Sequence, residues 1–418
     1  MTRIGFAYNL KPEIGQQPAP AAEGPRADEE PPSRRRDERS RNATATALHR
    51  SAGGTPTATL PTSDEYAEWD TPETIDAVER ALAGLGEVVR LEANADFPAK
   101  LRATRPDIVF NMAEGLYGPN RESHVPAICE FFDVPYSGSD PFTLSLCLDK
   151  ARTKEVLSHH GVPTASFALV GALSDLAGVA HRLGAPRSRR RAAPTDRPLP
   201  FPLFVKPVHE GSSKGITERN FVRDVAELEA QVAFLLESYA QPVVIEEYLP
   251  GREFTCAVLG NGALARVLPI VAMRFDALPA GAIPIYGYEA KWLWDRPEHP
   301  LAIFECPARL DPALRPAIER VTLRAYRALG CRDWSRIDVR LDADGVPNVV
   351  EVNPLPGILP DPEDNSCFPK AARAAGLSYD ELIQACLLLA AERQGVPLAV
   401  PATARELGSM MRRAAATG

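Results

Sequence analysis

Residues 335–357 read SRIDVRLDADGVPNVVEVNPLPG, and this stretch decides the fold of the second half of the chain. Two runs of alternating polar and apolar residues flank the turn sequence DADG, a pattern that predicts a β-hairpin. Side chains alternate faces along a strand, so Arg336 and Asp338 point the same way. The same holds for Glu351 and Asn353 on the second run. If the two faces coincide, one guanidinium and three oxygen ligands meet in one place.

The chemistry of these side chains indicates a site for a hard cation. Carboxylate and amide oxygens suit Mg²⁺ that bridges phosphates, rather than zinc. The alternative is an ordinary solvated polar face. The residues between the polar ones are strongly apolar, which favours a buried site with Asp338, Glu351 and Asn353 as metal ligands.

A lysine followed by a loop of small residues forms a second candidate site. Lys206 ends the apolar run FVK and precedes EGSSKG at 210–215. An ammonium group, two hydroxyls and backbone N–H groups in this order can bind phosphates. The lysine precedes the loop, so this is not a Walker A motif, and a merely flexible turn is the alternative.

A third candidate is the polar end of another strand. Residues 246–249 read EEYL, and Glu253 follows shortly after. A carboxylate and backbone groups at a strand end can bind an adenine edge and ribose hydroxyls. A polar strand exit without function explains the pattern equally well.

The alternation of strands and helices predicts an α/β fold, with helices packed on a parallel sheet in the N-terminal part. The predicted strands are Arg3–Asn9, Glu87–Leu91, Asp107–Phe110, Pro135–Tyr136, Leu203–Lys206, Val243–Tyr248, Glu253–Leu259, Ala265–Pro269, Ser335–Leu341 and Asn348–Asn353. The predicted helices are Asp70–Leu85, Phe97–Arg105, Glu122–Phe132, Ala151–His160, Val225–Tyr239, Pro312–Leu329 and Tyr379–Gln394.

Two stretches of unusual composition lie between or within the expected domains. Residues 11–64 are rich in Pro, Ala, Arg, Ser and Thr without periodicity, and we expect this insert to be disordered. A second Arg/Pro-rich stretch, 187–200, is expected to be a surface insert. The expected domains are an N-terminal α/β domain at 1–145, a lobe at 146–250, a second lobe with the metal site at 251–395, and a loose tail at 396–418.

Composition also excludes several classes of protein. The 418 residues carry a net charge of −8, which argues against nucleic acid or anionic lipid as a partner. The longest apolar run is about half the ~20 residues that a membrane-spanning helix needs. The seven scattered cysteines form no CxxC pair, which suits a reducing cytoplasm and argues against a zinc or disulfide framework.

Six ordered motifs together resemble the ATP-grasp superfamily and, within it, the D-alanine–D-alanine ligase family. The resemblance extends from about Leu144 to Leu389. The motifs are LDKARTK at 148–154, EGSSKG at 210–215, EEYLPGREFT at 246–255, YGYEAK at 286–291, GCRDWSRIDV at 330–339 and EVNPLPG at 351–357. The family resemblance implies a Rossmann-like N-terminal domain followed by two ATP-grasp lobes that clamp the nucleotide.

The resemblance implies which residues bind ATP. From the phosphates to the base they are Lys150, Lys206, Glu210, Ser212, Ser213, Lys291, Glu253, Glu246, Glu247, Tyr248 and Leu249. Lys150 and Lys206 would hold the α- and β-phosphates, and Lys291 would contact the γ-phosphate. Ser212 and Ser213 belong to the loop that would close over them, and Glu253 would bind the ribose.

The resemblance also implies the reacting groups. Asp338, Glu351 and Asn353 would bind two Mg²⁺ ions, for which Mn²⁺ can substitute, with Glu351 bridging them. Arg336 and the backbone N–H of Gly357 would stabilise an oxyanion. With these two residues, Ser212 and Lys291 complete the expected catalytic set.

The sequence departs from the family pattern on the substrate side. The family's usual His-Gly pair is replaced by Glu114-Gly115, and Trp292 replaces a tyrosine. Glu114 and Arg121 are candidates for recognising the donor substrate, with a local ion pair or helix cap as an equally weighted alternative. Ser366 is expected beside the carboxylate of the acceptor, after four extra residues.

The family's glutamate that follows the first strand is also absent. Glu65 or Glu73 could replace it, although neither is marked by a motif. All departures lie on the substrate side, whereas the ATP and metal motifs are complete.

These observations favour a cytoplasmic ligase that joins a carboxylate to an amine through an acyl phosphate and acts on small amino-acid-like substrates. Dipeptide formation like that of D-alanine–D-alanine ligase, within cell-wall (peptidoglycan) synthesis, is the leading function. A ligase for other amino acids or for a natural-product intermediate is the alternative, and a silent nucleotide-binding protein is a third. Relatives are usually homodimers.

Overall fold

The computed structural model describes residues 2–12, 66–115, 117–185, 194–287, 289–294 and 301–398, without the side chains of Trp292 and Leu293. The chain divides into two compact units, one of residues 1–11 and 68–418 and the other of residues 12–67. Only Pro12, Tyr66 and Ala67 of the second unit are described, so the expected disordered insert lies almost wholly outside the described residues. The same is true of the expected loose tail beyond residue 398.

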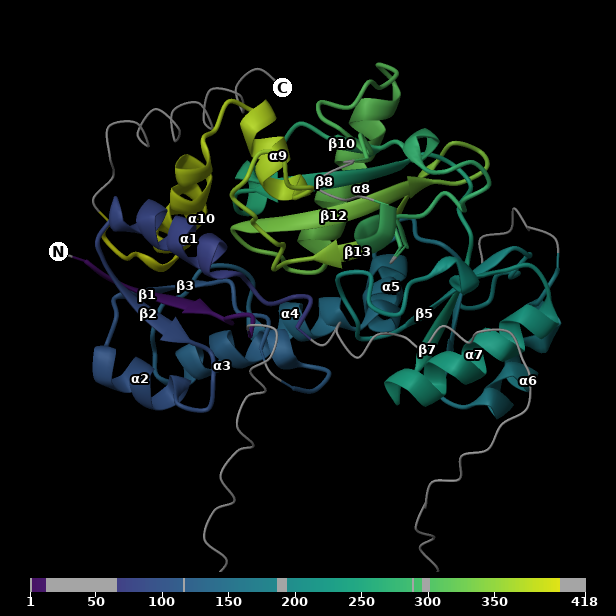
Figure 1. Ribbon diagram of the computed structural model, residues 1–418, viewed down its shortest axis with the longest axis horizontal. Coiled ribbons are helices and arrows are strands. Elements are labelled where there is room, and N and C mark those ends of the chain that lie inside the picture. The colour runs from purple at the N-terminus through teal and green to yellow at the C-terminus, as the bar shows by residue number, and fades with distance from the viewer. Residues whose placement is uncertain are drawn as a thin grey trace, which may run out of the picture. The chain divides into compact units, whose positions relative to one another are not determined.

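The N-terminal part contains a three-stranded parallel sheet with helices on both faces (Figure 1). The strands, in spatial order, are β2 (Glu87–Glu92), β1 (Arg3–Tyr8) and β3 (Ile108–Asn111). One face packs against α1 (Pro72–Ala83) and α10 (Tyr379–Gln394), the other against α2 (Phe97–Thr104) and α3 (His124–Phe131). Burial on both faces explains why β1 is an almost continuous apolar run.

The segment that follows forms a four-stranded antiparallel sheet. Its strands, in spatial order, are β4 (Phe167–Val170), β7 (Val243–Glu247), β5 (Leu203–Pro207) and β6 (Phe221–Val222). Before it come α4 (Pro141–Leu148) and α5 (Lys150–His159), and α6 (Leu176–Val179) and α7 (Val225–Tyr239) pack on the sheet. Leucines and valines of α7 and the strands form a separate core here.

The last sheet is antiparallel and carries the hairpin on which the sequence analysis centred. Its strands, in spatial order, are β11 (Phe304–Glu305), β10 (Val271–Met273), β8 (Glu253–Leu259), β12 (Trp334–Leu341) and β13 (Pro347–Asn353), and β9 (Arg266–Val267) pairs with β8. Helix α8 (Leu314–Ala328) covers one face, and α9 (Cys367–Ala374) lies with α10 on the other.

Capping residues set where the helices begin, and one of them positions a functional side chain. Asp149 caps α5 by accepting from the backbone N–H of Arg152 at 2.9 Å, which places Lys150 in the first turn. Helix α10 begins with a capping box between Ser378 and Glu381. Thr71, rather than the neighbouring Asp70, caps α1.

Three of the expected segments differ in the structure. The strand expected at Pro135–Tyr136 is a single bridge between Tyr136 and Val109, and the other two are the insert at 187–200 and the strand at 265–269. Residues 186–193 lie outside the described part, but Pro194 and Leu199 are buried, so this end of the expected surface insert packs into the lobe. The strand expected at 265–269 is reduced to β9, whose two residues pair with Val258 and Leu259 of β8.

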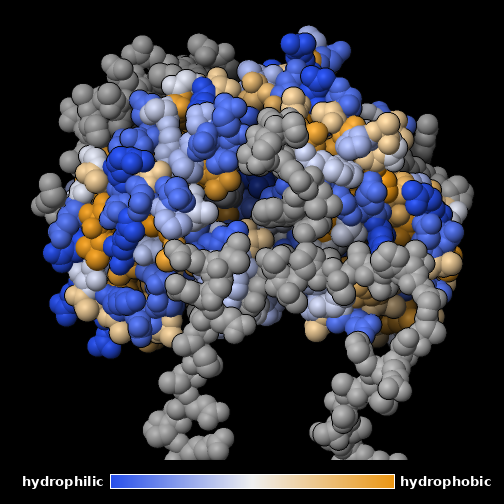
Figure 2. Space-filling view, viewed as in Figure 1, coloured by the Kyte–Doolittle hydropathy of each residue, from blue (hydrophilic) through white to orange (hydrophobic). Residues whose placement is uncertain are grey.

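Hydrophilic residues cover most of the face drawn in Figure 2, with hydrophobic ones in small groups. Among the described residues, no single helix is long and apolar enough to cross a membrane. Only α9 and α10 taken together reach that length and composition, and they are bent by 101° to each other.

Candidate active site

The hairpin β12–β13 brings its four polar side chains onto one face. Arg336 is paired with Asn353 and Asp338 with Glu351, and residues directly opposite in an antiparallel ladder share a face. Asp338 accepts a hydrogen bond from the hydroxyl of Thr255 on β8 at 2.9 Å and lies 3.3 Å from the Arg336 guanidinium. Burial, and then the charge of Glu351, raises the pKa of Asp338.

Lys150 links the N-terminus of α5 to this face. Its Nζ lies 2.8 Å from Oε1 of Glu351 and also donates to the backbone carbonyl of Glu210. Burial opposes ionisation of Glu351, but Lys150 and then Lys206 outweigh it and lower the pKa of Glu351 to about 2. The Lys150 ammonium group therefore contacts the carboxylate that is expected to bind metal.

A buried charge triad lies nearby. Glu246 Oε1 is 3.2 Å from the Nζ atoms of both Lys154 and Lys206. Lys154 also donates to Thr164, whose hydroxyl donates to the carbonyl of Val349, at 2.9 Å in each case. The side chain expected to line the nucleotide therefore contacts two lysines, and Lys154 and Thr164 link β7 to β13.

Glu253, the expected ribose ligand, is held by a residue that the sequence analysis did not identify. Arg340 donates to Glu253 at 2.8 Å and to the hydroxyl of Tyr248 at 2.7 Å, and its guanidinium lies 4.7 Å from the centre of the Tyr248 ring. Strand alternation puts Arg340 on the same face as Arg336 and Asp338, a signal that could have identified it.

The loop after Lys206 adopts an unusual backbone conformation. Ser212 and Ser213 have φ values of 49° and 62°, a region that non-glycine residues rarely adopt. The Ser213 hydroxyl donates to the carbonyl of Tyr286 at 3.1 Å. Strained loops of this kind occur at ligand sites, and consecutive N–H groups in them can bind anions.

The remaining catalytic candidates lie on two other segments. Lys291 is in a π-helical turn, Glu289–Trp294, and burial, then the charge of Arg336, lowers its pKa to about 8. Ser366 donates to the carbonyl of Gly357 at 3.1 Å and accepts from the N–H of Leu359, which fixes this loop. The side chain of Trp292 lies outside the described ones.

On the substrate side, Arg121 contacts Glu68 rather than a neighbour in sequence. Its Nη2 lies 3.1 and 3.0 Å from the two carboxylate oxygens of Glu68, and its Nη1 donates to the carbonyl of His209 at 3.0 Å. Lys214 lies 3.0 Å from the same carboxylate. Arg121 therefore forms an ion pair with a residue 53 positions away, and not the local ion pair that was the alternative to substrate recognition.

Glu68 is the acidic residue that sequence reasoning missed. Of the two proposed replacements for the family's glutamate, Glu73 is exposed on α1 and Glu65 lies outside the described residues. Glu68 approaches the phosphate loop so closely that a Cβ at Gly211 would lie 2.3 Å from its Oε1. No motif marks Glu68, because its position depends on contacts with residues far away in sequence.

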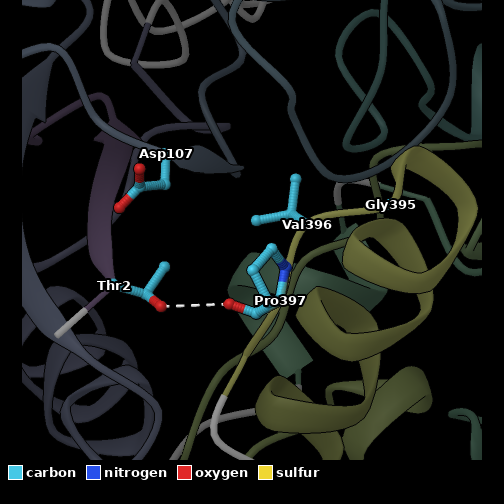
Figure 3. Close-up of a pocket in the computed structure, with 5 residues that line it drawn as sticks. All are labelled: Thr2, Asp107, Gly395, Val396 and Pro397. Atoms are coloured by element: carbon cyan, nitrogen blue, oxygen red, sulfur yellow. Dashed lines mark hydrogen bonds between the residues drawn. The ribbon is translucent and has the colours of Figure 1, made fainter.

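A separate hollow lies away from these residues and carries no further catalytic group (Figure 3). It is lined by Thr2, Asp107, Gly395, Val396 and Pro397. The Asp107 carboxylate accepts from the backbone N–H of Arg3 at 2.7 Å, and Thr2 donates to the carbonyl of Pro397 at 3.0 Å. Its polar groups are therefore used in holding the two chain segments together.

Within the described ranges, no three His, Cys, Asp or Glu side chains converge closely enough to hold a metal ion by themselves. Mg²⁺ commonly takes one or two carboxylates and completes its shell with water and substrate phosphates. The facing pair of Asp338 and Glu351 fits that requirement.

Comparison with known proteins shows which proteins this chain resembles. Residues 182–388 match the family model described as D-ala D-ala ligase C-terminus. The D-alanine–D-alanine ligase of Bordetella petrii is 37% identical over 284 residues, covering 68% of this chain and 76% of the relative. An uncharacterized protein of Sinorhizobium fredii is 35% identical over 286 residues, with coverage of 68% and 75%.

A solved structure shows the same fold. The D-alanine–D-alanine ligase from Bacillus anthracis, in complex with ATP, superposes with a TM-score of 0.58 at 22% identity. The match covers 94% of this chain and 99% of that one.

Proposed function

This chain belongs to the D-alanine–D-alanine ligase family, and we propose that its buried polar site carries out the ligase reaction with the residues described above. It is an ATP-grasp enzyme, an ATP-dependent ligase that forms a peptide bond. The observation that carries the assignment of the site is the ion pair of Lys150 with Glu351, on the strand face that also carries Asp338 and Arg336.

Two buried lysines in this position would bind the phosphates of ATP. Lys150 is only 7% exposed and already contacts a carboxylate, so an anionic phosphate is a matching ligand for it. The loop with Ser212 and Ser213 would add hydroxyl and N–H donors. Lys291 would contact the γ-phosphate, and Glu253, held by Arg340, would bind the ribose.

Asp338, Glu351 and Asn353 would hold Mg²⁺. When bound, the ion offsets the negative charge of the phosphates and activates the γ-phosphoryl group. Asn353 Oδ1 now accepts from the N–H of Leu355 at 2.9 Å, so the loop after β13 is tied to this residue.

The reaction proceeds in two steps. The carboxylate of the donor attacks the γ-phosphorus, ADP leaves, and an acyl phosphate forms. The amine of the acceptor then attacks the acyl carbon, and the oxyanion faces Arg336 and the N–H of Gly357. Phosphate departs and the amide remains. Closure of the 210–215 loop would exclude water, which otherwise hydrolyses the acyl phosphate.

The second candidate, a ligase for other amino acids, is favoured by the substrate side. Glu114 stands where the family has histidine, and Glu68 is engaged by Arg121 and Lys214. The relatives include an uncharacterized protein at almost the same identity as the named ligases. Both candidates use the same ATP chemistry, so they differ only in substrate.

The experiment that decides between them is ADP release from Mg·ATP, screened over D- and L-amino acids, with products identified by mass. D-Ala-D-Ala as the main product supports dipeptide formation for cell-wall synthesis. Release with other amino acids only would identify the divergent ligase. Absence of ADP across the panel would contradict the proposed chemistry for these substrates.

A further inference from the structure

Arg340 is a buried arginine that joins three segments of the chain beside the expected nucleotide site. It lies on β12 directly opposite Glu253 of β8, and its Nη1 donates to Oε2 of Glu253 at 2.8 Å. Its Nη2 donates to the hydroxyl of Tyr248 at 2.7 Å and to the carbonyl of Pro284 at 2.9 Å. Only 6% of Arg340 is exposed, so its charge is largely removed from water and depends on these partners.

Two aromatic rings restrict the guanidinium group further. Its central carbon lies 4.7 Å from the centre of the Tyr248 ring and 5.2 Å from that of Phe275. A guanidinium is attracted to aromatic rings at such distances, more strongly where water is excluded. The Tyr248 ring packs edge-on against Phe221, with 4.8 Å between the ring centres. The guanidinium of Arg340 therefore has little freedom to move, which makes it a rigid support for the carboxylate that it contacts.

The carboxylate of Glu253 is engaged through one oxygen. Arg340 contacts Oε2, and no hydrogen bond between described residues involves Oε1. The side chain of Glu253 keeps 17% of its surface exposed. Burial raises the pKa of Glu253, and the charge of Arg340 is the largest influence that opposes this rise. Arg340 thus orients the carboxylate and favours its charged form, while Oε1 stays available to accept from a ligand hydroxyl.

We infer that Arg340 is a positioning residue that determines how tightly this protein binds the ribose of ATP, through its charge and its bond to Glu253. The inference rests on the proposed function, in which Glu253 binds the ribose. A carboxylate that is held in its charged form accepts a stronger hydrogen bond from a hydroxyl than a protonated one does. Arg340 itself is not required to touch the nucleotide, so its role differs from that of the motif residues.

The test compares nucleotides that differ by one ribose hydroxyl. Binding of Mg·ATP, Mg·2′-deoxy-ATP and Mg·3′-deoxy-ATP to the full-length protein is measured by calorimetric titration, without an amino acid, so that no acyl phosphate forms. For each protein, the larger Kd of the two deoxy nucleotides is divided by the Kd of ATP. In the unaltered protein we expect this ratio to be at least about ten, because the deoxy nucleotide lacks a hydrogen bond to a charged group.

Two substitutions of Arg340 separate its charge from its other contacts. Arg340→Met keeps a side chain between the two rings but removes the charge, so the ratio should fall to about three or less as burial favours the protonated form of Glu253. Arg340→Gln repeats this measurement if the methionine variant does not fold. Arg340→Lys keeps a positive charge opposite Glu253 and should keep the ratio at least about twice that of Arg340→Met.

Arg252→Met is the matched control. Arg252 precedes Glu253 in the chain and is exposed, with its central carbon 5.0 Å from the centre of the Phe254 ring. It donates to the carbonyl of Arg309 at 3.2 Å and not to Glu253. Loss of this arginine beside a ring should therefore leave the ratio as it is in the unaltered protein.

An equal loss of affinity for all three nucleotides in Arg340→Met would overturn the inference, because it would mark a purely structural role. So would a ratio in Arg340→Lys no higher than in Arg340→Met, or a ratio near one in the unaltered protein. These outcomes leave the ligase assignment intact. If the unaltered protein bound none of the three nucleotides, the proposed function would be contradicted together with the inference.

Discussion

Lys150 Nζ lies 2.8 Å from Oε1 of Glu351 and so joins the first turn of α5 to the end of the hairpin β12–β13. These residues are 201 positions apart in the chain, and the contact joins the lysine that we propose to bind phosphate to the carboxylate that we propose to bind metal. Each of the proposed ATP and metal roles depends on this juxtaposition.

Replacing Glu351 tests that relationship. Glu351→Gln removes the charge that Lys150 and Lys206 share, and it should lower kcat at least about 100-fold by the loss of a preorganised charge. The circular dichroism spectrum should stay unchanged. Glu305→Gln, on β11 and paired with surface Arg309, is the control. Full turnover by Glu351→Gln would refute the metal assignment.

The triad of Lys154, Glu246 and Lys206 should be a stability determinant. Glu246→Gln leaves two buried lysines without their carboxylate and should cost about 3 kcal/mol of unfolding free energy, measured by urea denaturation. Lys154→Met keeps the pair of Lys206 and Glu246, so it should cost clearly less. Equal losses in both variants would contradict this account.

The same triad predicts how stability depends on pH. Burial opposes ionisation of Glu246, but Lys154 and then Lys206 outweigh it and hold its pKa below the ordinary value of 4.5. Its contribution is therefore complete above pH 4.5 and is lost as the pH falls further. Glu246→Gln should flatten the unfolding free energy against pH in that range, and an unaltered slope would argue against the ion pairs.

The lowered pKa of Lys291 predicts that ATP affinity decreases at alkaline pH. Its pKa of about 8 means that the free protein loses this positive charge as the pH rises through 8, so ATP affinity should fall there. Lys291→Arg keeps its charge at all these pH values and should move the decline upward. Calorimetric titration at several pH values measures this, and identical profiles for both proteins would exclude Lys291 from the phosphate site.

Composition predicts that residues 17–60 are disordered, and on that prediction their deletion should change the melting temperature by less than a degree or two. The N–H of Lys11 donates to the carbonyl of Asp70 at 2.8 Å, a contact that does not involve the deleted residues. A drop of several degrees would show that the segment packs on the body of the protein.

The parts of the fold that could be predicted are those with strong local patterns. The hairpin of β12 and β13 follows from the alternation of polar and apolar residues around DADG, and α10 occupies the range Tyr379–Gln394 expected for it. The short elements α4, β4 and α9 were missed, because four to eight residues are too few to show a period.

The candidate ATP and metal residues could be chosen from sequence because each occurs in a motif. The contacts of Glu68 could not be predicted, since its partners are Arg121, which is 53 positions away, and Lys214. Arg340 belongs to a strand that carries a motif. Its pairing with Glu253 could not be predicted, because the pairing depends on the register between β12 and β8. Local motifs therefore mark candidate residues, whereas their partners depend on contacts between distant parts of the sequence.

The central claim is that a donor carboxylate is activated as an acyl phosphate, and an isotope measurement tests it most directly. The amino acid that supports ADP release is prepared with ¹⁸O in its carboxylate and incubated with the protein and Mg·ATP. Because the carboxylate oxygen attacks phosphorus and then leaves with it, the account predicts one ¹⁸O atom in each phosphate released with amide product. Unlabelled phosphate alongside amide formation would contradict it.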